Sequence, residues 1–206
     1  MNNLTYSSEF VNARTKNTRI FALGLIVLML FSEPLINSKH LVIGTLLFWM
    51  GYPLVIVGVL GRIYCSLYIG GHKGKMMVQE GPYRIVRNPL YVFSFIGITG
   101  ICLQSGMMTL LVIIWSSFFL YYPKIVQSEE SFLSQTFGEQ FITYAEQVPR
   151  WIPNFNRWQE PKEWGDVHLS FVRRTLIDAS ILFVAAPIFL LINKLHHHGL
   201  LYIYIP

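Results

Sequence analysis

The segment that decides the fold runs from residue 88 to residue 123 and reads NPLYVFSFIGITGICLQSGMMTLLVIIWSSFFLYYP. None of these 36 residues is Asp, Glu, Lys or Arg. As one helix the segment would be about 54 Å long, whereas the hydrocarbon core of a bilayer is about 30 Å thick. It is therefore predicted to fold back on itself, with a tight hairpin at the polar triplet Gln104-Ser105-Gly106.

Three further apolar windows flank this segment. Residues 20–38 contain one charged side chain, residues 40–61 contain none, and residues 176–193 contain only Asp178. Each is close to the roughly 20 residues that a helix needs to cross a bilayer. Of the 206 residues, 53% are hydrophobic and only 13% are charged, about half the charged share of a typical soluble domain. The composition excludes a disordered chain and predicts an all-α, polytopic membrane protein with about five transmembrane helices.

Lysine and arginine are unevenly distributed around these five predicted spans. Fourteen of the 16 lie before the first span, between the second and third, or between the fourth and fifth, all on one side of the membrane. Because positive loops remain in the cytoplasm, we expect the N-terminus and both long polar segments on the cytoplasmic face of a bacterial inner membrane. This topology and attraction to anionic lipids explain the basic excess, so no nucleic-acid partner is predicted.

The first polar segment ends in EGPYRIVRNPLY, residues 80–91, and leads directly into the third span. Pro89 suits the first turn of a helix, where the missing N–H has no intrahelical partner to lose. Two arginines and two tyrosines are grouped here at a membrane boundary. A binding site is one explanation, and an aromatic belt with snorkelling arginines is the other.

The second polar segment contains two adjacent carboxylates and an amphipathic pattern. The pair Glu129-Glu130 follows the fourth predicted span. Apolar residues then recur every three or four positions over residues 132–148, which predicts an amphipathic helix interrupted near Gly138. The glutamates either form a solvated first helical turn or lie close to Arg84 and Arg87 of the first polar segment.

In their order and spacing, these motifs resemble the isoprenylcysteine carboxyl methyltransferase and phospholipid methyltransferase family. The resemblance covers about residues 75–153. It implies an integral membrane enzyme without a Rossmann domain, which transfers a methyl group from S-adenosylmethionine to a membrane lipid or lipidated acceptor. We then expect a methyltransferase core at 62–160 between two regions, residues 1–61 and 161–206, that carry the other spans. The matching pieces are Gly81-Pro82-Tyr83, Arg87-Asn88-Pro89-Leu90-Tyr91, Glu129-Glu130 and Val148-Pro149-Arg150 with Pro153.

The resemblance also implies roles for individual residues, and it implies no metal. Arg87, Glu129 and Glu130 are the expected catalytic residues. The planar fork of Arg87 suits the cofactor carboxylate, and either glutamate could accept hydrogen bonds from the ribose or the amino group. Arg150 and Trp151 are expected near the polar end of the acceptor at the membrane interface, and a plain anchoring role is the favoured explanation of Trp151. The residues expected to bind S-adenosylmethionine are Tyr83, Arg87, Asn88, Pro89, Tyr91 and Glu129.

The sequence departs from the family pattern at three positions. Asn88 replaces a common histidine, Phe93 replaces a small residue, and Lys75 replaces another histidine. An amide cannot take a proton near neutral pH, which favours an oxygen acceptor that is already anionic. A phospholipid amine acceptor stays open, and so does a non-catalytic membrane scaffold that keeps the family architecture.

Overall fold

In the computed structural model, residues 41–69 and 76–159 are described, together with residues 173, 176, 177 and 180. These residues are helical or irregular, and no strand occurs among them, as predicted. The first predicted span and nearly all of the fifth lie outside the described residues, so the count of five stays a prediction. The elements are α3 (Leu41–Ile69), α4 (Pro82–Ile85), α5 (Pro89–Ser105), α6 (Met108–Phe137), α7 (Glu139–Gln147) and the 3-10 helix η1 (Phe155–Arg157).

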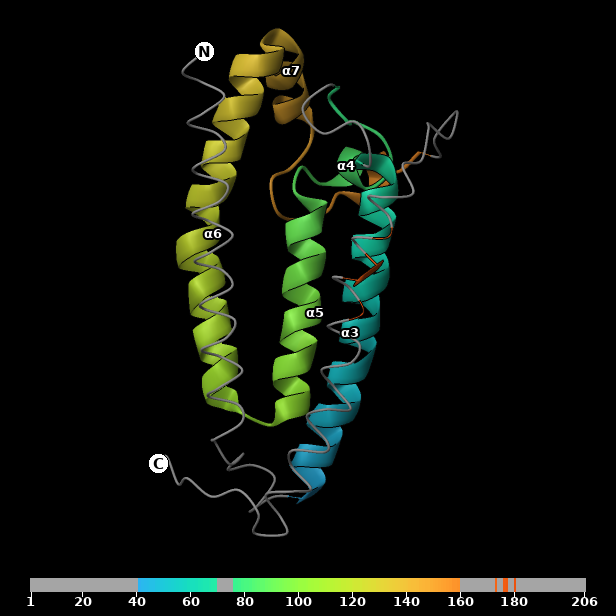
Figure 1. Ribbon diagram of the computed structural model, residues 1–206, viewed down its shortest axis with the longest axis vertical. Helices are drawn as coiled ribbons and strands as arrows, with labels where there is room; N and C mark the ends of the chain where they lie inside the picture. The colour runs from blue at the N-terminus through green and yellow to red at the C-terminus, as the bar shows by residue number, and fades with distance from the viewer. Residues whose placement is uncertain (1–40, 70–75, 160–172, 174–175, 178–179, 181–206) are drawn as a thin grey trace.

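Helices α5 and α6 form the hairpin that the sequence predicts (Figure 1). Gly106 follows α5 with φ of 66°, a left-handed conformation that suits glycine at the end of a helix. The hydroxyl of Ser105 donates to the carbonyl oxygen of Cys102 at 2.7 Å and accepts from the Met107 N–H at 3.1 Å. Backbone polar groups of the turn are thus satisfied within the protein, as a turn at membrane depth requires.

Helices α3 and α5 pack closely because glycines face each other across their contact. A Cβ atom on Gly58 would lie 2.4 Å from the Cα atom of Gly97, and one on Gly51 would lie 2.4 Å from the carbonyl oxygen of Gly100. Side chains of any size would force the two backbones apart. Small residues allow this close approach between membrane helices, where van der Waals contact drives association.

Two helices continue past the apolar windows from which the spans are predicted. The window that contains the fourth predicted span ends at Pro123, and α6 continues to Phe137. The window of the second span ends at Gly61, and α3 continues to Ile69 and includes Arg62. Proline is tolerated inside membrane helices, where neighbouring groups satisfy the carbonyl it leaves unpaired. Within the part of the chain that the structure describes, two helices could cross a membrane by length and composition, Val42–Ile69 and Met108–Phe137, whereas the apolar helix Pro89–Ser105 is shorter.

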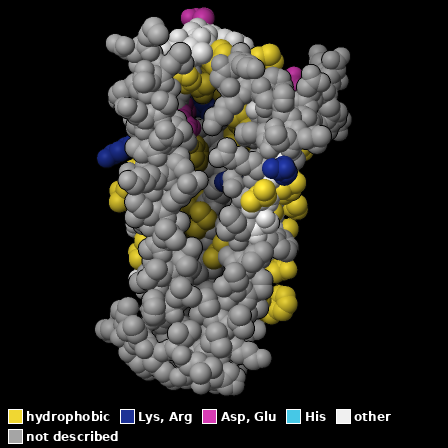
Figure 2. Space-filling view, in the orientation of Figure 1, with side chains coloured by type: hydrophobic (Ala, Val, Ile, Leu, Met, Phe, Trp, Pro, Cys, Tyr) yellow, Lys and Arg dark blue, Asp and Glu magenta, His cyan; other side chains and the backbone are white. Residues whose placement is uncertain are grey.

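The short elements α4, α7 and η1 gather at the end of the bundle opposite the α5–α6 turn (Figure 1). Gly138, with φ of 55°, separates α6 from α7 and confirms the predicted interruption. Phe141, Tyr144 and Val148 then form a small buried core against α6. On the face that Figure 2 shows, the acidic side chains lie toward this same end.

Candidate active site

Glu130 of α6 lies between two arginines from separate parts of the chain. Its exposed fraction is 8%. Arg150 binds both carboxylate oxygens, with Nε 3.2 Å from Oε1 and Nη2 2.6 Å from Oε2. Arg87 approaches the same carboxylate, with Nη1 3.3 Å from Oε1. The predicted meeting of Arg87 with the glutamate pair is therefore confirmed, and the alternative of a solvated first helical turn is wrong.

The neighbouring carboxylate, Glu129, contacts the start of α5. The hydroxyl of Tyr91 donates to Oε1 of Glu129 at 2.9 Å. The Tyr91 ring also packs edge-on against Tyr122 of α6, with ring centroids 5.2 Å apart. Adjacent glutamates thus hold different partners, and both connect α6 to the motif that opens α5.

The first turn of α5 is tied to the segment after α7. Pro89 is buried at the first helical position, as expected, and Asn88 is the N-cap residue. The Asn88 side chain donates through Nδ2 to the carbonyl oxygen of Arg150 at 3.3 Å, and the Arg87 N–H donates to that of Pro149 at 2.9 Å. Asn88 therefore joins the start of α5 to the segment after α7.

Helix α4 presents Tyr83 to the same region. It begins after Gly81, whose φ of 55° favours glycine. The Tyr144 hydroxyl of α7 donates to the carbonyl oxygen of Tyr83 at 2.6 Å, and Nε of Arg84 donates to that of Arg157 at 3.1 Å. Arg84 is thus bound to η1 and not to the glutamate pair.

The two buried tyrosines of this region stay protonated well above neutral pH. Desolvation raises the pKa of Tyr83 and of Tyr144 above the ordinary phenol value. The negative charge of Glu129 adds to the effect at Tyr83. At Tyr144, Arg87 acts in the opposite direction and Glu130 reinforces the rise of the pKa. Both phenols can therefore donate hydrogen bonds at neutral pH.

Three buried polar atoms in this region have no hydrogen-bond partner: the Tyr83 hydroxyl, Nε of Arg87 and Nε of Arg157. Such groups are costly to bury and call for an explanation. Arg87 uses Nη1 for Glu130, so its other edge, which carries the unpartnered Nε, can still bind a carboxylate. The donors that the protein offers here fit an amino-acid end and a hydroxyl-bearing group, such as S-adenosylmethionine carries.

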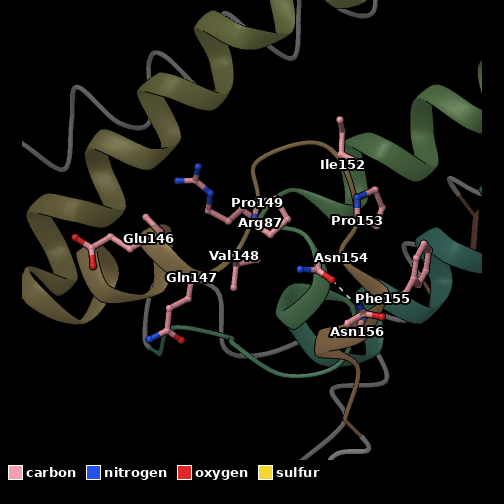
Figure 3. A pocket seen from close by; sticks show the side chains of 11 residues that line it. Arg87, Glu146, Gln147, Val148, Pro149, Ile152, Pro153, Asn154, Phe155 and Asn156 are labelled. Carbon is pink, nitrogen blue, oxygen red and sulfur yellow. Dashed lines mark hydrogen bonds between the residues drawn. The ribbon is translucent and has the colours of Figure 1, made fainter.

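An open hollow of about 670 Å³ adjoins the cluster (Figure 3). Its walls come from the end of α7 and from the segment that follows, and Arg87 lies between these two groups. Of the six residues expected to bind the cofactor, Arg87 alone lines this hollow. The others lie at the starts of α4 and α5 and on α6. The lining residues are Arg87, Ala145, Glu146, Gln147, Val148, Pro149, Ile152, Pro153, Asn154, Phe155 and Asn156.

Sequence reasoning missed several members of the site. It gave no structural partner for Arg150, which is 20 residues from Glu130 along the chain. It also assigned no role to Tyr122, although the aromatic residues before Glu129 were a signal. Trp151 contacts Phe118 of α6, with ring centroids 5.5 Å apart, so it packs between elements.

Known proteins support a family assignment. The phospholipid methyltransferase family matches residues 39–140. The chain is 34% identical to the nickel-cobalt-cadmium resistance protein NccN of Alcaligenes xylosoxydans xylosoxydans, over 73% of each chain. It is 32% identical to the cobalt-zinc-cadmium resistance protein CzcN of Cupriavidus metallidurans, over 66% of this chain and 62% of CzcN.

A third relative is named for its reaction. The protein-S-isoprenylcysteine O-methyltransferase B of Arabidopsis thaliana is 31% identical over 39% of this chain and 41% of its own length. No solved structure matches the chain. With the motifs and helical hairpin described above, these matches show that the chain belongs to the membrane methyltransferase family that includes phospholipid methyltransferases and isoprenylcysteine O-methyltransferases.

Proposed function

We propose that this protein transfers a methyl group from S-adenosylmethionine to a lipid-like acceptor at the cytoplasmic face of the membrane. One observation carries the proposal: the motif that opens α5 and the glutamate pair of α6 meet through Arg87–Glu130 and Tyr91–Glu129. Family membership supports the reaction class.

Different residues of the cluster would bind different groups of the cofactor. The edge of Arg87 that carries the buried, unpartnered Nε would bind the carboxylate in two parallel hydrogen bonds. Glu130 holds Arg87 in place through Nη1, and Glu129 would accept from an amino or ribose hydroxyl group. The protonated phenol of Tyr83 would supply a hydrogen bond, and the ring of Tyr91 would stabilise the cation.

Methyl transfer needs alignment of two reactants and exclusion of water more than it needs acid or base chemistry. In the proposed step, an acceptor oxygen forms the new O–CH₃ bond while the C–S bond of the sulfonium breaks and its electron pair remains on sulfur. An anionic oxygen loses its negative charge in this step and releases no proton. Because Asn88 cannot accept a proton, the site suits such an oxygen better than an ammonium.

Methylation of a phospholipid amine is the second candidate function. It would require a base to remove the ammonium proton, and Glu129 is the carboxylate that Tyr91 holds beside the start of α5. The pH dependence separates the two candidates: an amine acceptor makes the rate rise with pH as the ammonium loses its proton, whereas a phosphate or carboxylate acceptor leaves it flat near neutrality.

The test of the proposed function is cofactor binding to purified full-length protein in detergent. Isothermal titration should show binding of S-adenosylmethionine, and the variants Arg87→Ala and Glu129→Ala should weaken it by about tenfold or more, as loss of a hydrogen bond to a charged group predicts. Lys124→Ala is the matched control, because Lys124 is an exposed cation on α6. Absence of binding to the unmodified protein would refute the proposal and favour a non-catalytic scaffold.

The acceptor itself can be identified by labelling. Purified protein is incubated with methyl-labelled S-adenosylmethionine and a total lipid extract of the host, and the labelled product is analysed by mass spectrometry. A base-labile methyl ester would support an oxygen acceptor. A label that resists base and travels with an amine head group would support the second candidate.

The names of two relatives concern metal resistance, and the proposed reaction offers a link. Carboxylate and phosphate oxygens are ligands for divalent cations, and methylation would remove the negative charge of one such group. We propose that membranes containing the product retain less cobalt or cadmium. Vesicles made from lipids of host cells with and without the gene should therefore differ in metal retention, and equal retention would refute this link.

A further inference from the structure

We propose that Arg62 binds the anionic group of the acceptor, which is therefore an acidic lipid, at the junction of α3 and α5. Binding of an acidic lipid at this position is the new inference. Naming that lipid as the acceptor rests on the proposed function.

Arg62 is an isolated charge in its helix. No other Asp, Glu, Lys or Arg occurs in Leu41–Ile69, and none occurs in Pro89–Ser105, the helix that packs against it. An ionisable side chain in a membrane-spanning helix is expensive and marks a functional position unless it is paired. Among the described residues, no carboxylate forms an ion pair with Arg62.

The guanidinium group of Arg62 has more donors than it has hydrogen-bond acceptors among the described residues. Nη1 of Arg62 donates to the hydroxyl oxygen of Ser94 on α5. That hydroxyl in turn donates to the Leu90 carbonyl oxygen at 2.5 Å, so Ser94 is a neutral partner that leaves the charge uncompensated. Nε of Arg62 is buried and has no hydrogen-bond partner. An oxyanion is the ligand that would supply both the missing charge and the missing acceptors.

The depth of Arg62 suits a lipid head group. The 20 residues of α3 from Val42 to Gly61 span about 30 Å, the thickness of the hydrocarbon core, and Arg62 follows them. The end of α3 lies near α4, because a Cβ atom on Gly81 would come within 2.4 Å of the Tyr68 ring. Arg62 is therefore at the same end of the bundle as the candidate active site.

Helix α5 connects the two places directly. Ser94 and Tyr91 are three residues apart on α5, and residues at this spacing are neighbours about 5–6 Å apart on a helix surface. Tyr91 holds Glu129. A lipid whose anion is bound at Arg62 would thus have its head group about one helical turn from the glutamate pair, within reach of a bound methyl donor.

The test measures which lipids stay bound to the purified full-length protein. In a neutral detergent, the protein is mixed with phosphatidylglycerol, oleate or diacylglycerol, and bound lipid is counted by native mass spectrometry. We expect one phosphatidylglycerol or oleate to be retained in preference to diacylglycerol. Arg62→Gln should reduce that retention about tenfold, as loss of a charge-assisted hydrogen bond predicts, and Lys124→Gln, the matched exposed cation, should not.

Further arms keep the proposal falsifiable. Arg62→Lys preserves the charge but not the fork, and should retain acidic lipid to an intermediate degree even if Arg62→Gln does not fold. Millimolar inorganic phosphate distinguishes a lipid from a soluble anion: displacement of the lipid by free phosphate at that level would overturn the proposal. Equal retention by unmodified protein and Arg62→Gln, or no preference over diacylglycerol, would also overturn it.

The outcome is separable from that of the proposed function. Arg62→Gln should bind S-adenosylmethionine as the unmodified protein does, and should raise the KM for the acceptor without changing the KM for the methyl donor. If the protein binds acidic lipid through Arg62 but no S-adenosylmethionine, the proposed function fails and the lipid site stands. If the protein binds S-adenosylmethionine but shows no preference for acidic lipid, the proposed function stands and the lipid site fails.

Discussion

Glu130 is buried beside Arg87 and Arg150, so a change at this position alters the electrostatic environment of both. Glu130→Ala would leave Arg87, whose side chain is 15% exposed, without its counter-ion. Removal of one partner from a buried pair typically costs about 3–5 kcal/mol. We expect about 3 kcal/mol here, since the Arg150 side chain is 42% exposed and can regain water.

Unfolding in detergent followed by circular dichroism measures this loss. Glu139→Ala is the control, because Glu139 is exposed at the start of α7 and contributes through the helix dipole alone, about 0.5 kcal/mol. Equal losses for the two variants would show that the ion pairs contribute no net stability.

Tyr144 provides a second prediction at the scale of one side chain. Tyr144→Phe removes the 2.6 Å hydrogen bond to the Tyr83 carbonyl oxygen and should lower the free energy of unfolding by about 1–2 kcal/mol at pH 8. The folded-state pKa of Tyr144 is raised by burial, so between about pH 10 and that pKa the folded state keeps a proton that the unfolded state has lost.

The contribution of Tyr144 to stability should therefore be constant up to about pH 10 and fall above it. In the unmodified protein each such phenol contributes a slope of about 1.4 kcal/mol per pH unit, and Tyr144→Phe removes one of these contributions. Denaturant unfolding at pH 8, 10 and 11 checks the sign and the slope. Identical slopes in the two proteins would contradict the burial of this hydroxyl.

Substitution of a glycine in the contact between α3 and α5 should destabilise the packing of these two helices. Gly58→Ala places a Cβ atom 2.4 Å from Cα and 2.6 Å from N of Gly97, and neither backbone atom can turn away. The helices must separate, at a cost of about 1–3 kcal/mol. Val57→Ala is the control, since Val57 is 46% exposed on the same helix and should change stability by less than about 0.5 kcal/mol. Thermal unfolding in detergent compares them, and equal melting temperatures would refute the close contact.

The same elements show what local sequence could predict. The α5–α6 turn was predictable because Gly106 interrupts an apolar segment too long to cross the membrane once, and Gly138 similarly marked the break before α7. The extension of α6 beyond Pro123 was not predictable from local sequence, because proline usually marks a helix boundary. Here the helix continues and places Glu130 in a buried position.

The candidate site was predictable in part for a related reason. The opening of α5 and the glutamate pair were recognisable as motifs, but their partners come from distant parts of the chain. Arg150 reaches Glu130 across a separation of 20 residues, and Tyr144 reaches Tyr83 across 61. Such pairings depend on how α7 returns toward α4, and the spacing of residues along the chain does not specify that path.

At the scale of the whole molecule, the short elements α4 and α7 lie at one end of the described helices and the tight α5–α6 turn lies at the other (Figure 1). The positive-inside distribution of Lys and Arg predicts that α4 and α7 face the cytoplasm. A Thr109→Cys variant marks the turn and a Gln140→Cys variant marks α7, since both positions are exposed. The native thiols Cys65 and Cys102 are buried and are replaced by serine in both variants.

A membrane-impermeant maleimide applied to intact spheroplasts should label Thr109→Cys and leave Gln140→Cys unlabelled, because α7 is then inside the cell. After the spheroplasts are opened with detergent both should react, which controls for side-chain access. The reverse pattern would invert the predicted orientation. S-adenosylmethionine is supplied in the cytoplasm, so the reverse pattern would also place the Arg87–Glu130 cluster on the wrong side of the membrane. That result would refute both the predicted orientation and the proposed methyl transfer.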